Sequence, residues 1–323
     1  MARRSLLIAL LSTVVAACGS GKQAPTAASG ADPRESAAPA AASAAAPAAL
    51  PATTVADGSP QIALAPDGVH IEYHVYGRGE PAIVLIHGWA TDANYWNAQV
   101  DALKGLYTVV TVDLAGHGAS GKNRTDWSMG TYGEDVATVV RQLPSSRVIL
   151  VGHSMGATVA LEATRRIGDR VVGIIAVDAL RSIGLPPLSK SQIEAQVAPF
   201  RADFIGQTRK LVAESLFRKD ANPLFVQKVA YDMSLEPPEV GVPALQALLS
   251  VDFATLLPDI HVPVLAINSD LAPTDEARIR KSVPAFKAVV LDHTDHFLMM
   301  EVPQRFNPLL LRDIDSLRAR SRG

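Results

Sequence analysis

Residues 147–156 read RVILVGHSMG, and this stretch decides the fold. The apolar run over 147–151 predicts a buried strand, and Ala and Leu at helical spacing over 155–167 predict a helix. Between them, Gly152 and Gly156 flank Ser154 in the pattern G-x-S-x-G. So tight a turn holds the serine in a strained conformation with its hydroxyl projecting, and we expect a side chain at either glycine to clash with backbone. The helix N-terminus behind Ser154 favours negative charge that develops there.

Short apolar strands alternate with helices on both sides of this turn. The sequence predicts strands over 69–76, 82–86, 107–112, 147–151, 171–177, 263–267 and 288–291, and helices over 93–103, 130–143, 155–167 and 303–318. This alternation is typical of an α/β fold with a mostly parallel central sheet and helices on both faces, in which ligands bind beyond the carboxyl ends of the strands. The alternation of strands and helices stops over about 182–257, where the sequence has scattered prolines and helical stretches over 191–197 and 204–217. We interpret this segment as a helical cap inserted between two core strands.

Three further motifs follow predicted strands. They are HGW at residues 87–89, DLAGHGAS at 113–120, and His296-Phe297 followed by Glu301 and Pro303. Together with the G-x-S-x-G turn, their order resembles the α/β-hydrolase fold family across residues 61–320. The resemblance implies acyl transfer by a serine nucleophile, with a histidine base in the loop after the last strand and the chain order serine, acid, histidine.

The resemblance assigns roles to individual residues. Ser154 would attack a carbonyl carbon and His296 would take its proton, because a serine hydroxyl is a poor nucleophile without a base. The backbone N–H groups of Met155 and Trp89 would hold the oxyanion. His293 is an alternative base, but it lacks the following Phe and the downstream Glu-x-Pro pattern.

The position of the acid departs from the family pattern. The usual aspartate follows the strand predicted over 263–267, where this chain has Ala272. Asp178, at the end of the strand over 171–177, is the first choice, because a carboxylate at the end of a buried strand needs a partner. Asp270 is the alternative acid, and Asp275, or no acid at all, is the third possibility. Whichever residue it is, the acid fixes the tautomer of His296 and stabilises the imidazolium.

We therefore predict a serine hydrolase that cleaves a carboxylic ester of a small or medium lipophilic substrate, with no cofactor and no metal. The alternatives are an amidase, a peptidase or a C–C bond hydrolase that uses the same residues, or a non-catalytic ligand-binding protein that keeps the fold. The sequence shows no H-E-x-x-H or comparable metal-binding spacing. Its oligomeric state is left open.

The N-terminal sixty residues read as a targeting signal and a linker. Arg3 and Arg4 precede a twelve-residue apolar run over 6–17, and small residues then lead to Cys18, the chain's one cysteine. This pattern resembles a bacterial lipobox, with Cys18 as the lipidated residue. Residues 19–60 hold 16 Ala and 6 Pro, which predicts a disordered tether. We expect a lipid-anchored protein of the bacterial cell envelope, preferably on the outer membrane facing the periplasm. A secreted or periplasmic protein is the alternative.

Composition sets limits on partners. With 30 Lys+Arg and 32 Asp+Glu in 323 residues, the net charge is −2, which gives no electrostatic basis for nucleic-acid binding. One cysteine excludes an internal disulfide framework. The expected partners are a small ester substrate and, through the N-terminal lipid, a membrane surface.

Overall fold

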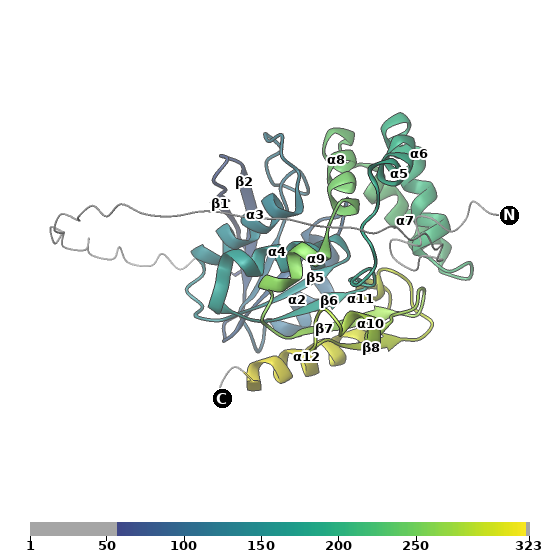
Figure 1. The fold of residues 1–323 in the computed structure, drawn as a ribbon. Coiled ribbons are helices and arrows are strands. Elements are labelled where there is room, and N and C mark those ends of the chain that lie inside the picture. Colours follow the sequence, from purple (N-terminus) through teal and green to yellow (C-terminus); the bar gives the residue numbers. More distant parts are fainter. Residues whose placement is uncertain (1–56, 321–323) are drawn as a thin grey trace, which may run out of the picture. The chain divides into compact units, whose positions relative to one another are not determined.

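A computed structural model describes residues 57–320, and within them eight strands form one sheet in the order β1-β2-β4-β3-β5-β6-β7-β8 (Figure 1). β2 runs antiparallel to β1 and β4, and the remaining neighbours are parallel. The predicted mostly parallel α/β fold is therefore confirmed. The strands are β1 (Pro60–Leu64), β2 (His70–Tyr76), β3 (Ala82–Ile86), β4 (Val109–Val112), β5 (Val148–His153), β6 (Val171–Val177), β7 (Val264–Ser269) and β8 (Lys287–Leu291).

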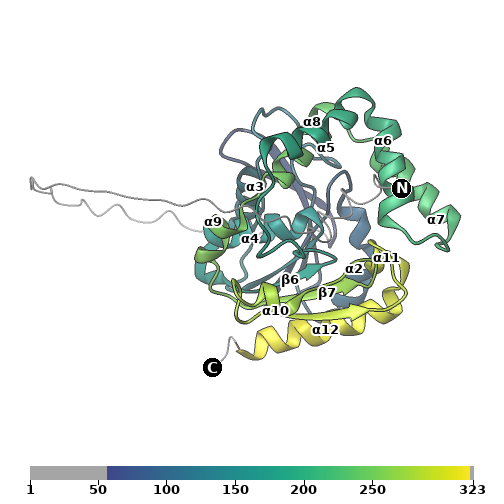
Figure 2. The same cartoon turned by 45° about the vertical axis from the view of Figure 1, so that its right-hand side comes forward.

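Helices cover both faces of the sheet. α3 (Met129–Gln142) and α4 (Met155–Ile167) pack together on one face, and α2 (Asn97–Leu103) and α12 (Pro303–Arg320) pack together on the other. Figure 2 shows α12 running along the sheet on the side away from the cap helices. The helix predicted over 93–103 begins as a 3-10 turn over Ala93–Trp96, which Asp92 caps, before it continues as α2.

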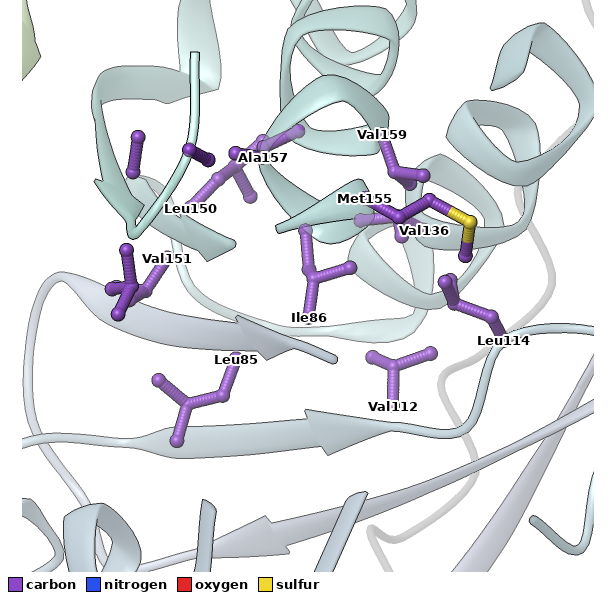
Figure 3. Close-up of a cluster of buried hydrophobic side chains, with 14 of the residues drawn as sticks. Leu85, Ile86, Val112, Leu114, Val136, Leu150, Val151, Met155, Ala157 and Val159 are labelled. Carbon is purple, nitrogen blue, oxygen red and sulfur yellow. The ribbon is translucent and has the colours of Figure 1, made fainter. Parts of the chain in front are cut away.

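The core lies where α3 and α4 meet the central strands. Figure 3 shows Ile86 of β3 and Val112 of β4 on the side of the sheet where Val136 of α3 and Val159 of α4 lie, and all four are fully buried. Parallel strands covered on both faces are apolar on both faces, which explains their continuous hydrophobic runs. This packing holds the carboxyl ends of the strands, where site residues are expected, in fixed relative positions.

The segment between β6 and β7 is helical. It contains α5 (Lys190–Ala202), α6 (Phe204–Leu211), α7 (Pro223–Ser234), α8 (Pro238–Leu249) and α9 (Phe253–Leu256). The helix predicted over 204–217 is α-helical only to Leu211 and continues as a π-helical turn over Val212–Leu216. Figures 1 and 2 both show α5 to α8 gathered on one side of the sheet. We refer to residues 182–257 as the cap.

The predicted signal peptide, Cys18 and most of the predicted tether lie outside the described residues. Within residues 57–320, no single helix is long and apolar enough to cross a membrane. α8 and residues 253–259 meet that criterion only as a pair bent by 76°. The described chain begins just before β1, where Gly58 N–H donates to the Val75 carbonyl over 2.8 Å.

Candidate active site

Ser154 lies in a strained turn between β5 and α4. Its φ of 52° is in the left-handed region, which costs a non-glycine residue about 1–3 kcal/mol. A Cβ on Gly152 would lie 2.2 Å from the Gly156 carbonyl oxygen, and a Cβ on Gly156 would lie 2.4 Å from the carbonyl oxygens of Ile86 and His87. The expected clashes at both glycines are confirmed. The end of β3 and the loop after it therefore lie close against this turn.

His296 and Asp178 are joined by a buried hydrogen bond. His296 Nδ1 lies 2.7 Å from Asp178 Oδ2, although the residues are 118 positions apart, and their side chains are 4% and 2% exposed. A carboxylate accepts only, so Nδ1 carries the ring proton and Nε2 is the basic nitrogen of the neutral imidazole. His296 N–H also donates to the Leu216 carbonyl over 3.0 Å, which ties the loop after β8 to the cap.

Asp178 is held by donors from three segments. Its Oδ1 accepts from Arg181 Nη2 and from Ser269 N–H, each over 2.6 Å, while Oδ2 accepts from His296. Burial alone would raise the pKa of Asp178, but the Arg181 charge and the hydrogen bond from His296 outweigh it and hold the pKa well below its usual range. Asp178 therefore stays ionised throughout the physiological pH range.

The other candidate acids point elsewhere. Asp270 is exposed and pairs with Arg218, and Asp275 is exposed and caps a helical turn by accepting from Arg278 N–H over 2.9 Å. His293, the alternative base, is exposed and has a left-handed backbone. Among the three aspartates considered, the structure brings only Asp178 within hydrogen-bonding distance of His296.

Two buried histidines support the site without a charge. His87 accepts from Leu114 N–H at Nε2 over 2.9 Å and donates from Nδ1 to the Gly88 carbonyl over 2.8 Å. Burial lowers its pKa to about 4. His153 Nε2 lies 2.9 Å from the His296 carbonyl oxygen, and burial lowers its pKa to about 3. Both rings are neutral at pH 7, and each secures a loop of the site through backbone hydrogen bonds.

The two predicted oxyanion donors lie beside Ser154. Met155 is the first residue of α4, where a backbone N–H has no partner within its helix. Trp89 lies in the loop after β3 and lines the same cavity as Ser154 and Met155. Its indole N–H donates to the Gly241 carbonyl in the cap over 2.7 Å, and its ring packs edge-on against Phe200 and Phe204. The loop that carries this backbone N–H is thus fastened to the cap.

Ser154 and His296 open into a cavity of about 120 Å³ beneath the cap. The cap contributes only apolar side chains to its wall apart from Ser182, and no Asp, Glu, Lys or Arg is among the described residues that line it. These apolar cap residues are Leu211, Leu216, Met233, Leu245, Leu248, Leu249 and Phe253. An engineered apolar cavity of about 150 Å³ holds benzene. The cavity therefore suits a compact, uncharged organic group.

No cluster of three or more His, Cys, Asp or Glu side chains within residues 57–320 is arranged to hold a metal ion. Sequence reasoning missed two residues of the site, Arg181 and Asn268. Asn268, fully buried at the end of β7, accepts from Ala179 N–H over 3.1 Å and supports the segment after Asp178. The one available signal was their position at or just after strands that end beside the site.

A family model described as the alpha/beta hydrolase family matches residues 83–309. A pimeloyl-[acyl-carrier protein] methyl ester esterase from Yersinia enterocolitica is 26% identical over 74% of this chain and 95% of its own length. An uncharacterized protein from Mycobacterium tuberculosis is 36% identical over 112 residues, which cover 35% of this chain and about a third of that relative.

Among solved structures, an esterase from Exiguobacterium antarcticum superposes with a TM-score of 0.72 and 21% identity. The superposition covers 80% of this chain and all of the esterase. At this identity the likeness concerns the fold alone, which agrees with the sheet order and the turn at Ser154.

Proposed function

The chain belongs to the alpha/beta hydrolase family, and from this premise we propose that it is a serine hydrolase that cleaves carboxylic esters through an acyl-enzyme on Ser154. The observation that carries the proposal is the buried His296–Asp178 hydrogen bond of 2.7 Å, at the cavity that Ser154 also lines. This pairing supplies what a serine nucleophile needs, a base whose tautomer is fixed by an acid.

In the first half-reaction, Ser154 Oγ bonds to the ester carbonyl carbon while its proton passes to His296 Nε2. The backbone N–H groups of Met155 and Trp89 stabilise the oxyanion, and losing one such donor typically lowers kcat about 10²–10³-fold. The tetrahedral intermediate collapses, the alcohol leaves with the proton from His296, and Ser154 is acylated. In the second half-reaction a water molecule gives a proton to His296 Nε2 while its oxygen bonds to the acyl carbon. The bond from that carbon to Ser154 Oγ then breaks, Ser154 takes the proton back from His296, and the carboxylic acid leaves.

The cavity argues for a compact, neutral group beside the scissile bond. A charged group would have to be desolvated against an apolar wall with no counter-ion, which is costly. A short aliphatic or small aromatic group would instead gain about 25 cal/mol for each Å² of apolar surface buried. We therefore propose esters of small lipophilic substrates.

We further propose that Cys18 is lipidated and that the protein is anchored in the cell envelope, facing the periplasm from the outer membrane. The support is the apolar run before the cysteine and the Ala/Pro-rich segment after it. A Cys18→Ala variant should then be recovered in the soluble periplasmic fraction, while the parent protein partitions with membranes. Equal partitioning of both would argue for an ordinary secretory signal.

The test of the activity is hydrolysis of p-nitrophenyl esters from acetate to decanoate, with Ser154→Ala as the control. We expect turnover that is absent in the control, and a fluorophosphonate probe that labels the parent protein at Ser154. A folded protein that neither turns over these esters nor reacts with the probe would contradict the proposal. Probe labelling without ester turnover would instead favour amide, peptide or C–C bond chemistry.

A further inference from the structure

A buried arginine lies against the side of Asp178 that faces away from His296. Arg181 is 3% exposed, and its Nη2 donates to Asp178 Oδ1 over 2.6 Å and to the Ser269 carbonyl over 2.9 Å. Burying a cation is expensive unless it is paired and hydrogen-bonded, and this one is paired with the carboxylate that meets His296. The guanidinium thereby links the end of β6 to the end of β7.

The segment after β6, which this link helps to hold, has a strained backbone. Asp178 and Leu180 have φ values of 48° and 62°, both left-handed. Asn268 accepts from Ala179 N–H, and Arg278 donates to the Arg181 carbonyl over 2.6 Å. The acid therefore lies on a strained segment that neighbouring strands and side chains hold in place.

Among residues 57–320, the charged or titratable side chains that contact Asp178 come from two sides. Arg181 approaches from the loop after β6, and His296 from the loop after β8. The end of β7 presents the uncharged Ser269 and Asn268. The end of β5 presents His153, whose ring centroid lies 4.6 Å from that of His296 and which burial keeps neutral. Arg181 is therefore the one permanently charged cation in the described part of the chain that pairs with Asp178.

We infer that Arg181 is a positioning residue of this site: its guanidinium keeps Asp178 ionised and aimed at His296, and so extends the reaction to lower pH. The inference rests on the proposed function, because it gives the Asp178–His296 pair a role in catalysis. A protonated Asp178 carboxyl would be a weaker acceptor of the hydrogen bond from His296 Nδ1–H than the ionised carboxylate is. The histidine would then lose the partner that fixes its tautomer.

The test compares three variants of the full-length protein. Arg181→Met removes the charge and keeps much of the aliphatic bulk, whereas Arg181→Lys keeps the charge. Arg218→Met is the matched control, because it makes the same substitution at an arginine that pairs with Asp270 at the surface. Should Arg181→Met fail to fold, Arg181→Gln removes the charge while retaining a hydrogen-bond donor.

Two readouts are followed across pH. One is kcat/KM for a p-nitrophenyl ester, and the other is the far-downfield proton resonance of the His296 Nδ1–H···Asp178 hydrogen bond, with Asp178→Asn as its assignment control. In Arg181→Met we expect the acid limb of kcat/KM to move up by at least one pH unit and the resonance to disappear at a correspondingly higher pH. Arg181→Lys should restore the parent profile at least in part, and Arg218→Met should keep it.

A uniform loss of rate in Arg181→Met at every pH, with the resonance persisting as in the parent, would overturn the inference and leave Arg181 a structural role. The resonance does not depend on turnover. If the parent protein hydrolyses no ester, the proposed function fails, while the resonance in Arg181→Met still decides whether Arg181 keeps Asp178 ionised.

Discussion

His296 Nδ1 lies 2.7 Å from Asp178 Oδ2, and both side chains are almost fully buried. β6 and β8 do not pair with each other in the sheet, because β7 lies between them. The hydrogen bond therefore crosses above the end of β7, whose last residue, Ser269, donates its backbone N–H to the other oxygen of Asp178. In the usual family pattern the acid follows the strand that corresponds to β7. Asp178 instead follows β6, one strand further from the loop that carries His296.

This relationship predicts the effect of removing the acid. Asp178→Asn keeps the shape of the side chain but offers its amide N–H to His296, which favours the wrong tautomer. We expect kcat to fall by about 10⁴, the loss seen when a triad aspartate is replaced in this way. The measurement is kcat, with the folded fraction checked by circular dichroism.

Asp270→Asn is the matched control, since it changes the same group on the neighbouring strand end. Asp270 pairs with Arg218 at the surface, so we expect kcat within a few-fold of the parent. A full loss in Asp270→Asn together with an active Asp178→Asn would transfer the role of the acid to Asp270.

The local parts of the site could be predicted from the sequence. The turn at Ser154 is encoded in ten consecutive residues, and the buried strands beside it are apolar on both faces, so pattern and turn chemistry agree. The sequence does not predict β1, although four of its five residues lie within the predicted domain of residues 61–320. This strand is short and lies at the edge of the sheet, and of its residues only Ala63 is buried.

The sequence made Asp178 the first choice of acid but could not exclude Asp270, and it did not indicate the contact of Arg181 with Asp178, because these depend on contacts between distant segments. Asp178 and Asp270 both follow core strands, and only the folded chain shows that Asp270 pairs with Arg218 and not with His296. The cap was also only partly predicted. α8 starts at Pro238 and contains Pro243, a residue that argues against a helix unless packing overrides it, as it does here.

Gly156→Ala should disrupt the turn at Ser154. Its Cβ would lie 2.4 Å from two backbone carbonyl oxygens, that of Ile86 at the end of β3 and that of His87 directly after it, and neither can move without displacing the strand. We expect destabilisation of about 3 kcal/mol or more, measured by urea unfolding. Gly105→Ala, where a Cβ meets nothing within 4 Å, should leave stability nearly unchanged. Equal stability of the two variants would contradict the crowding at this turn.

Trp89→Phe should loosen the attachment of the cap. The change retains an aromatic ring against Phe200 and Phe204 but removes the indole N–H that donates to the Gly241 carbonyl. A buried carbonyl without its donor costs about 1–3 kcal/mol, so the free energy of unfolding should fall by that amount. We also expect faster proteolysis within the cap. An unchanged unfolding midpoint would show that water or another donor replaces the indole.

Glu236→Gln should change how stability depends on pH. Glu236 lies between α7 and α8 with its side chain 8% exposed, and its Oε1 is 3.8 Å from Nε2 of the buried His117. Burial raises the pKa of Glu236 to about 8 and lowers that of His117 to about 3, so the two form no ion pair at pH 7.

The sign follows from proton linkage. Below the ordinary carboxyl pKa, both the folded and the unfolded chain hold the proton. As pH rises from there through about 8, only the unfolded chain releases it, and the parent protein loses stability. Glu236→Gln cannot titrate, so its free energy of unfolding should exceed that of the parent by a few kcal/mol more at about pH 9 than at about pH 5. The exposed Glu239→Gln should show a much smaller change, and a pH-independent difference for Glu236→Gln would contradict the raised pKa.

Leu245→Ala should lengthen the ester that the cavity accepts. Leu245 is 6% exposed and lines the cavity from α8, so truncation removes three carbons from the wall. One methylene in an apolar pocket is worth about 1–3 kcal/mol in discrimination, so kcat/KM for esters two or three carbons beyond the parent's optimum should rise tenfold or more. A buried Leu→Ala change also costs about 2–5 kcal/mol of stability, so rates are compared below the unfolding midpoint.

The exposed Leu235→Ala, also in the cap, should keep the parent's chain-length profile. If Leu245→Ala keeps it as well, the acyl or alcohol group does not lie against α8.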